Sequence, residues 1–338
     1  MKRRLAPIVL GVAAIAGCAT SQQSEPGTTL TSTTSTTTSV SSTTTTAAPT
    51  TTAAAETTAA PTTTAAADTT APDTALPAGP TGDVFPLFIG EGDGLLTPLG
   101  QWDGGAWATT PDDATLPDAG REFTLSRLAG PVDGTVDGTG EVCFDERVGP
   151  TMTPAGGNAI PPAARYNGVA LPPPDWPLQP RRVAELGDDV PGYQELGEGA
   201  FDEFDVDATA GAVEQLVIAD LDGDGNTEAL VVFERVQEPT PGSPEVVLGS
   251  PGDFSGLLLV DTESRAATTV LSSVVIDDGD ELSIEFLEQY RVLDVADYNG
   301  DGRMEVAVSA WYSDGAGVAV FTFDGGELNE ALATGCGL

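Results

Sequence analysis

The sequence predicts an all-β domain that follows a segment unable to fold. Short runs of β-branched and aliphatic residues alternate with turns rich in glycine, proline and aspartate, and the most distinctive turns have no helical periodicity beside them. Residues 19–82 are almost entirely Thr, Ser, Ala and Pro and contain no aromatic residue. Such a segment cannot bury enough apolar surface to offset the entropy of ordering it, so we expect a disordered linker there.

The N-terminus has the pattern of an export signal. Basic residues at positions 2–4 precede a mostly apolar run over 5–16, which is too short for a membrane span of about 20 residues. The run ends in Ile15-Ala16-Gly17-Cys18, which resembles the lipobox of bacterial lipoproteins. The resemblance implies a signal peptide and lipobox over 1–18, a diacylglycerol on Cys18, and a membrane anchor on the extracytoplasmic side of the cell membrane. The alternative is a plain secretory signal.

Residues 83–338 are expected to form the folded domain, and they are strongly acidic. Three of the 13 basic residues and four of the 52 acidic residues lie before residue 83, which leaves 10 and 48. This charge disfavours nucleic acid as a partner, although adaptation of the surface to solubility or salt would also explain it. With no histidine and Lys2 as the only lysine, His-dependent nucleophile pairs, His-ligated zinc, Schiff bases and P-loops are excluded. Enzymes that use carboxylates alone, such as glycosidases, stay among the candidates.

Cysteine usage fits an exported chain. With Cys18 assigned to lipidation, Cys143 and Cys336 are left as an even pair. An oxidising compartment favours a disulfide between them. The alternative is that both are small buried apolar side chains on strands.

An acidic turn between two aliphatic runs is the most informative motif. It lies in LVIADLDGDGNTEALVVF, residues 216–233. Ca²⁺ takes six to eight oxygen ligands, and a tight loop can supply them from carboxylates on alternate residues and from a main-chain carbonyl. Positions 1, 3, 5, 6, 7 and 9 of this loop are Asp220, Asp222, Asp224, Gly225, Asn226 and Glu228.

A second copy of this loop begins 77 residues later, in LDVADYNGDGRMEVAVSAWY. Its flanking aliphatic residues match those of the first copy, and Arg303 at position 7 would contribute only its main chain. One carboxylate fewer predicts weaker binding here, and the pair predicts two calcium sites. Positions 1, 3, 5, 6 and 9 of the second loop are Asp297, Asn299, Asp301, Gly302 and Glu305.

Each loop is predicted to join two strands. An EF-hand needs a glutamate at position 12, where this chain has Val231 and Val308, and the flanks are β-branched. At these residues the sequence resembles the FG-GAP and VCBS repeats, the calcium-loop blades of integrin-alpha-like β-propellers, with the pattern D-x-D/N-x-D/N-G-x-x-D/E. The resemblance covers about 60 to 120 of the 338 residues. It implies that the side chains at positions 1, 3, 5 and 9 of each loop are calcium ligands. These are four acids in the first loop, and three acids and Asn299 in the second.

The two repeats, near 213–275 and 290–333, are each expected to hold four antiparallel strands, the size of a propeller blade. Residues 92–105 hint at a degenerate blade, and 150–190 are so rich in proline that we expect an irregular connection. The fold prediction is therefore a propeller-like or partial propeller, with a β-sandwich or an open stack of sheets as alternatives. The expected strands are 213–219, 229–235, 255–260 and 267–275, then 290–296, 306–312, 318–323 and 327–333.

Three kinds of function follow from these observations. We favour a non-catalytic cell-surface lipoprotein that binds or scaffolds protein or glycan, because the acids that stand out are all used as calcium ligands. The alternatives are a carboxylate-based enzyme acting on extracellular polysaccharide, with acids such as Asp103, Glu141 and Asp145, and a ligand sensor or uptake component. We expect packing rather than sugar-binding roles for the four tryptophans, Trp102, Trp107, Trp176 and Trp311.

Overall fold

The computed structural model describes residues 84–337 apart from several gaps, and the chain divides into two units, Met1–Asp73 and Thr74–Leu338. All described residues belong to the second unit. The predicted signal peptide, Cys18 and the linker lie outside the described residues. The gaps are 93, 111–114, 143–146, 156–165, 188–189, 191, 205, 238–248, 277–285 and 313–314.

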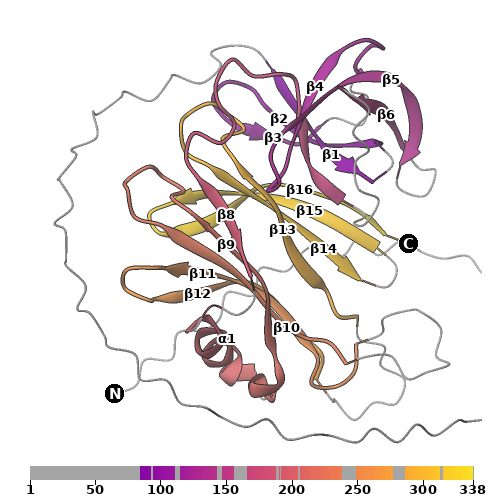
Figure 1. The fold of residues 1–338 in the computed structure, drawn as a ribbon. Helices are drawn as coiled ribbons and strands as arrows, with labels where there is room; N and C mark the ends of the chain where they lie inside the picture. Colours follow the sequence, from indigo (N-terminus) through magenta and orange to yellow (C-terminus); the bar gives the residue numbers. More distant parts are fainter. Residues whose placement is uncertain are drawn as a thin grey trace, which may run out of the picture. The chain divides into compact units, whose positions relative to one another are not determined.

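The described part is all-β, as predicted, with three antiparallel sheets (Figure 1). The sheets have seven, five and four strands, and within the described ranges none of them closes into a barrel. The strands of the first sheet are β1 (Phe85–Glu91), β2 (Leu96–Trp102), β3 (Trp107–Ala108), β4 (Glu122–Ser126), β5 (Val132–Val142), β6 (Arg147–Pro154) and β7 (Tyr166–Leu171).

The first sheet has a strand order that does not follow the sequence. Its order is β3-β2-β1-β7-β4-β5-β6, so β7 lies between β1 and β4. The prediction of an irregular connection over 150–190 is therefore wrong for this stretch. The strand itself, YNGVAL, contains no proline, and the prolines that suggested a loop lie just outside it. The stretch in which a degenerate blade was expected, residues 92–105, belongs to the antiparallel run β1-β2-β3 at one side of the seven-stranded sheet.

The second and third sheets contain the two predicted repeats, and all eight expected strands are present. The second sheet has the order β12-β11-β10-β9-β8, with the short β8 as an addition that the sequence did not suggest. The third sheet is the meander β13-β14-β15-β16. Their bounds are β8 (Val183–Leu186), β9 (Ala212–Ala219), β10 (Glu228–Arg235), β11 (Phe254–Asp261), β12 (Ala267–Val274), β13 (Gln289–Ala296), β14 (Glu305–Tyr312), β15 (Gly315–Asp324) and β16 (Glu327–Gly337).

Buried apolar side chains fill the interfaces between the sheets. One cluster lies between the second and third sheets and includes Leu230, Leu257, Val292 and Val306. Another lies between the first and third sheets and includes Leu87 and Val320. The third sheet therefore contacts both of the others. Because burial of apolar area is the main favourable term in folding, these shared faces make the three sheets depend on one another.

One α-helix is present among the described residues, α1 (Tyr193–Phe201), and the sequence analysis missed it. Tyr193 and Phe201 are buried, and the helix packs against β9, β10 and β12 (Figure 1). Two short 3₁₀ turns, η2 (Asp202–Phe204) and η3 (Ala208–Ala210), follow it. Across the described ranges, no helix has the length and apolar character that a bilayer crossing requires.

Candidate metal-binding loops

The two acidic loops, loop 1 (220–228) and loop 2 (297–305), connect equivalent hairpins of the two repeats. Loop 1 joins β9 to β10, and loop 2 joins β13 to β14. In both, the glycines at positions 4 and 6 have positive φ, 84° and 92° in loop 1 and 73° and 84° in loop 2. Only glycine adopts this conformation at little cost, so the D-G-D-G and N-G-D-G patterns determine the turn.

Position 1 holds each turn closed through its carboxylate. In loop 1, Asp220 accepts hydrogen bonds from the N–H groups of Gly223 and Gly225, at 2.7 and 3.2 Å. In loop 2, Asp297 accepts from Gly300 and Gly302, at 2.6 and 2.9 Å. The position 1 aspartate therefore has the same two partners in both copies.

The remaining ligand positions repeat the same scheme. The position 9 glutamate accepts a hydrogen bond from the N–H of position 2, at 2.9 Å in loop 1 and 2.8 Å in loop 2. Position 3 accepts from the N–H of position 5 at 3.1 and 2.9 Å, and position 5 accepts from the N–H of position 7 at 2.7 and 2.8 Å. The duplication read from the sequence is thus a duplication of geometry.

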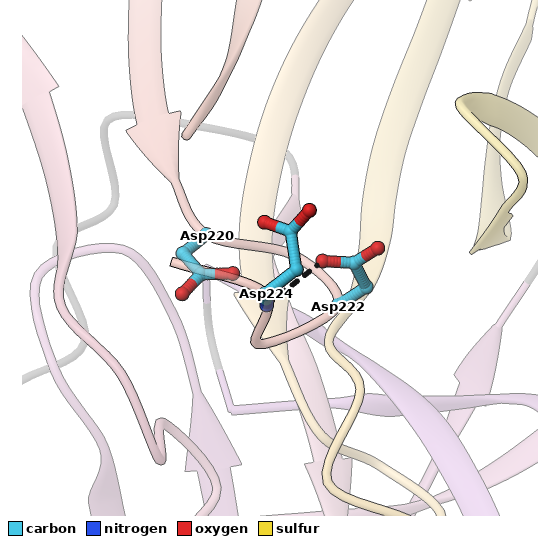
Figure 2. A group of neighbouring side chains, drawn as sticks. All are labelled: Asp220, Asp222 and Asp224. Carbon is cyan, nitrogen blue, oxygen red and sulfur yellow. Dashed lines mark hydrogen bonds between the residues drawn. The ribbon is translucent and has the colours of Figure 1, made fainter. Parts of the chain in front are cut away.

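Loop 1 brings three carboxylates together. One oxygen from each of Asp220, Asp222 and Asp224 lies within 4.8 Å of the others, and Figure 2 shows the three side chains on a single turn. Oxygens on opposite sides of a calcium ion are separated by about 4.8 Å, twice a typical ligand distance. An all-oxygen, carboxylate-rich set of this size fits a hard cation such as Ca²⁺. Among the described residues this is the only such group of three acids, so the acids of loop 2 do not form one.

The two loops differ in burial. The carboxyls of loop 1 are partly or fully exposed. In loop 2, Asp297, Asn299 and Glu305 have relative exposures of 1, 3 and 2%. Loop 2 thus combines one carboxylate fewer with the burial of three of its four ligand positions, while Asp301 is exposed. The sequence did not predict this burial.

Burial also changes the acidity of the loop carboxyls. Burial, together with the nearby charge of Asp301, raises the pKa of Asp297 to about 6, although the hydrogen bonds from Gly302 and Gly300 act to lower it. Burial likewise raises the pKa of Glu305 well above its usual range. Burial also raises the pKa of Glu228, and the negative charges of the three loop 1 aspartates add to this effect. A divalent cation beside these groups would oppose the shift, because an opposite charge favours the ionised form.

Position 7 is the predicted main-chain ligand in both loops. In loop 1, the Asn226 side-chain amide donates to Asp224 at 3.0 Å, so it stays within the turn. In loop 2, the Arg303 side chain forms a 3.0 Å ion pair with Asp324, the last residue of β15. The Arg303 guanidinium thus interacts with an acid outside the loop and does not point only to water. This agrees with the prediction that Arg303 contributes only its main chain to the site.

Sequence reasoning missed the segment that joins the loops. We call residues Trp176–Arg181 the clasp. Trp176 donates its indole N–H to the carbonyl of Asp297 at 2.8 Å, and Leu178 accepts from the N–H of Asp297 at 2.7 Å. Arg181, at the end of the clasp, contacts both loops. The only available signal was the presence of an aromatic and a basic residue in a proline-rich stretch.

The other candidate residues have structural roles or lie outside the described residues. Asp103 accepts hydrogen bonds from Gly105 and Ala106 in the β2–β3 turn. Glu141 lies on β5, whereas Asp145 is not among the described residues. Cys336 is buried, and its predicted disulfide stays a prediction because Cys143 lies in a gap.

The tryptophans take part in packing or internal hydrogen bonds, as expected. Trp102 and Trp107 form a tilted ring pair with centroids 4.9 Å apart, and Trp176 packs on Phe85. Trp311 donates its indole N–H to Gln289 at 2.9 Å.

Comparison with known proteins gives no relative from which a function could be transferred. No family model, curated protein or solved structure matches the chain significantly. The functional argument therefore depends on the loops themselves.

Proposed function

We propose that this domain is a non-catalytic binding or scaffolding module whose two acidic loops bind calcium, held at the cell surface by a lipid on Cys18. One observation carries the calcium assignment. Two loops 77 residues apart share one hydrogen-bond scheme, and the first gathers three carboxylates within 4.8 Å. A repeated all-oxygen set of this kind suits Ca²⁺ better than zinc or copper, which prefer nitrogen and sulfur.

The proposed role of the ions is structural. Each loop closes the first hairpin of its repeat, so a bound ion would fix two strands and neutralise their acids. Calcium sites of extracellular modules have dissociation constants of about 0.1 to 1 mM. At free calcium one to ten times the dissociation constant, binding to the folded state alone stabilises by about 0.4 to 1.4 kcal/mol per site.

The repeats also support a relation to propeller blades. The meander β13–β16 has the four antiparallel strands of a blade, and the second sheet has the same meander with one added strand. We propose that the two repeats are blade-like units of a partial propeller, with the seven-stranded sheet as a different element.

The calcium assignment is tested by removing one carboxylate without disturbing the turn. In Asp222→Asn the amide oxygen can still accept the hydrogen bond from the Asp224 N–H, so the turn keeps its geometry while one ligand charge is lost. Titration calorimetry should show two calcium sites in the wild-type domain, and the variant should bind calcium about tenfold more weakly at one of them, loop 1. Glu263→Gln, an exposed acid outside both loops, is the matched control and should bind like the wild type.

A thermal melt provides an independent test. Excess chelator should lower the unfolding temperature of the wild-type domain, and Asp220→Ala combined with Asp297→Ala should abolish that sensitivity. A wild-type melt that is identical with calcium and with chelator, together with a flat calorimetric titration, would refute calcium binding.

The anchor and the partner need separate experiments. Labelling with a radioactive fatty acid should mark the full chain, and Cys18→Ser should abolish the label. Screening the domain against glycans and exported proteins, with calcium and with chelator, should identify the ligand class. A calcium-dependent hit in either screen would support the proposed binding role, and hydrolysis of a polysaccharide would instead favour an enzyme.

A further inference from the structure

Arg181 connects the two loops through main-chain carbonyls. Its guanidinium donates to the carbonyls of Asp220 and Leu221 in loop 1, at 2.6 and 2.8 Å. The third nitrogen donates to the carbonyl of Gly302 in loop 2, at 2.7 Å. All three nitrogens of one side chain are therefore used at positions 1, 2 and 6 of the two turns.

The loops also contact each other directly. The N–H of Met304, at position 8 of loop 2, donates to the carbonyl of Leu221 at 2.8 Å. The carbonyl of Leu221 thus accepts from both Arg181 and loop 2. Movement of either turn would disturb a carbonyl or an N–H that the other turn depends on.

We infer that Arg181 couples the two loops, so that calcium bound at one loop raises the calcium affinity of the other. This inference rests on the proposed function, because it concerns the regulation of the same two sites. It makes Arg181 a positioning residue, since it contacts main-chain carbonyls of the loops and is not itself a calcium ligand.

The coupling follows from shared order. A bound ion restricts the turn that surrounds it, and an ordered loop 1 fixes the two carbonyls that orient the guanidinium. The third nitrogen of the guanidinium then already points to Gly302, so loop 2 loses less conformational freedom when it binds its own ion. Couplings of this kind usually change affinity by 5-fold or more, and a single shared side chain should give an effect on the order of 5-fold.

The guanidinium suits this role for a geometric reason. Arginine presents several N–H donors in a rigid planar fork, whereas the ammonium of lysine is a single compact group. A lysine at position 181 would keep the charge beside Asp220, whose carboxylate lies 3.8 Å from the Arg181 Nε. It could not reach three carbonyls on two loops at the same time.

The test measures how weakening one loop affects the other. Asp301→Asn weakens loop 2, Asp222→Asn weakens loop 1, and calcium titrations of the full domain are followed by the NMR amide signals of Gly225 and Gly302. In the wild-type background, Asp301→Asn should lower the affinity of loop 1 about 5-fold, and Asp222→Asn should lower that of loop 2 by the same factor, because coupling is reciprocal. In the Arg181→Lys background both effects should fall below about 2-fold.

Arg182→Lys is the matched control, because Arg182 is the exposed neighbour of Arg181 and the change also conserves charge. It should leave the coupling at about 5-fold. If both loops bind calcium but neither weakening substitution affects the other loop, the inference is wrong while the proposed function holds. Coupling that survives Arg181→Lys unchanged would assign it to the Met304–Leu221 contact and overturn the role of Arg181. If neither loop binds calcium, the proposed function itself fails, and the inference with it.

A second variant covers the case in which Arg181→Lys does not fold. The two weakening substitutions in the wild-type background then still decide whether the loops are coupled. Hydrogen exchange of the Gly225 and Gly302 amides in Arg181→Gln decides whether Arg181 keeps the two turns ordered.

Discussion

Asp294 is an acid that the calcium loops do not use. It lies on β13 with no exposed surface, accepts a hydrogen bond from the Tyr298 hydroxyl at 2.9 Å, and lies 3.4 Å from the amide nitrogen of Gln179. Burial raises the pKa of Asp294 from 3.8 to about 6, although its hydrogen bonds lower it. Ionising a carboxyl in such a place opposes folding, since the charge loses its hydration.

The pH dependence of stability should reveal this group. Between about pH 4 and pH 6 the folded state binds more protons at Asp294 than the unfolded state does, so its contribution to stability falls as the pH rises. A shift of about 2 units corresponds to at most about 3 kcal/mol at pH 7. Asp294→Asn lacks this penalty, so its stability relative to the wild type should increase from pH 4 to pH 7.

Urea unfolding at several pH values in the presence of chelator would measure this difference. Subtracting the wild-type curve removes the contributions of the other acids. A difference between the two proteins that does not change with pH would contradict the assignment to Asp294.

The residues of the candidate site were largely predictable, and their connection was not. The ligand positions and the glycines follow a local pattern, because a turn of nine residues is determined by its own sequence. Arg181 lies 39 residues before Asp220 and 121 before Gly302. No local pattern indicates a contact across such separations, and the burial of loop 2 was missed for the same reason.

At the scale of elements, α1 shows how packing overrides propensity. Two glycines in a helix of nine residues weaken it, yet Gly197 faces β10 so closely that a Cβ atom there would lie 2.4 Å from the ring of Phe233. Gly199 on the same helix has no atom within 4 Å of such a Cβ. Only the first glycine is therefore required by the fold.

Substituting the two glycines separates these effects. Gly199→Ala should stabilise the domain by about 0.5 to 1 kcal/mol, because alanine favours the helix. Gly197→Ala gains the same preference but must displace Phe233, so we expect a net loss of about 1 to 3 kcal/mol. Chemical denaturation of both variants provides the measurement, and a stabilising Gly197→Ala would contradict the close contact.

Strands were predictable where alternation or an aliphatic run was bounded by turn residues, which holds for all eight strands of the two repeats. The strand β7 was missed because the prolines on either side of it were counted with it, and α1 was missed because glycine lowers the helical signal. The apolar spacing of Tyr193, Leu196 and Phe201 was the available sign of a helix face.

At the scale of the whole molecule, one side chain of the second sheet, that of Gln215, forms main-chain hydrogen bonds with a strand of the third sheet. Gln215 on β9 is buried, accepts from the Val292 N–H at 2.8 Å and donates to the Val292 carbonyl at 3.0 Å. The Gln215 amide therefore pairs with main-chain groups at the edge of β13 that no described strand covers. At the same edge, the Ser255 hydroxyl on β11 accepts a hydrogen bond from the N–H of Tyr290 at 3.3 Å. Unpaired edge groups invite wrong pairing, so these side chains also protect the fold.

Replacing this amide should destabilise the whole domain. Gln215→Met keeps the size of the side chain but leaves a buried N–H and a buried carbonyl of Val292 without partners. We expect a loss of about 2 to 4 kcal/mol in the free energy of unfolding. Gln237→Met, at an exposed position, is the control and should change stability by less than about 0.5 kcal/mol. Equal effects of the two substitutions would show that the Gln215 bridge is unimportant.

The strand order of the first sheet was the least predictable feature of the fold, because it is set by pairings between segments that are distant in the sequence. Repeats with neighbouring strands paired can be read from sequence, whereas the insertion of β7 between β1 and β4 follows only from the complete packing.

That insertion has a consequence for the order in which the chain folds. The hairpin β1–β2 comes early in the sequence, but the edge of β1 that faces β7 stays unpaired until Tyr166–Leu171 joins it. The two later meanders pair neighbouring strands and can close one strand after another. A chain truncated before Tyr166 should therefore expose an unpaired β edge and aggregate, whereas a chain that includes Leu171 can cover that edge.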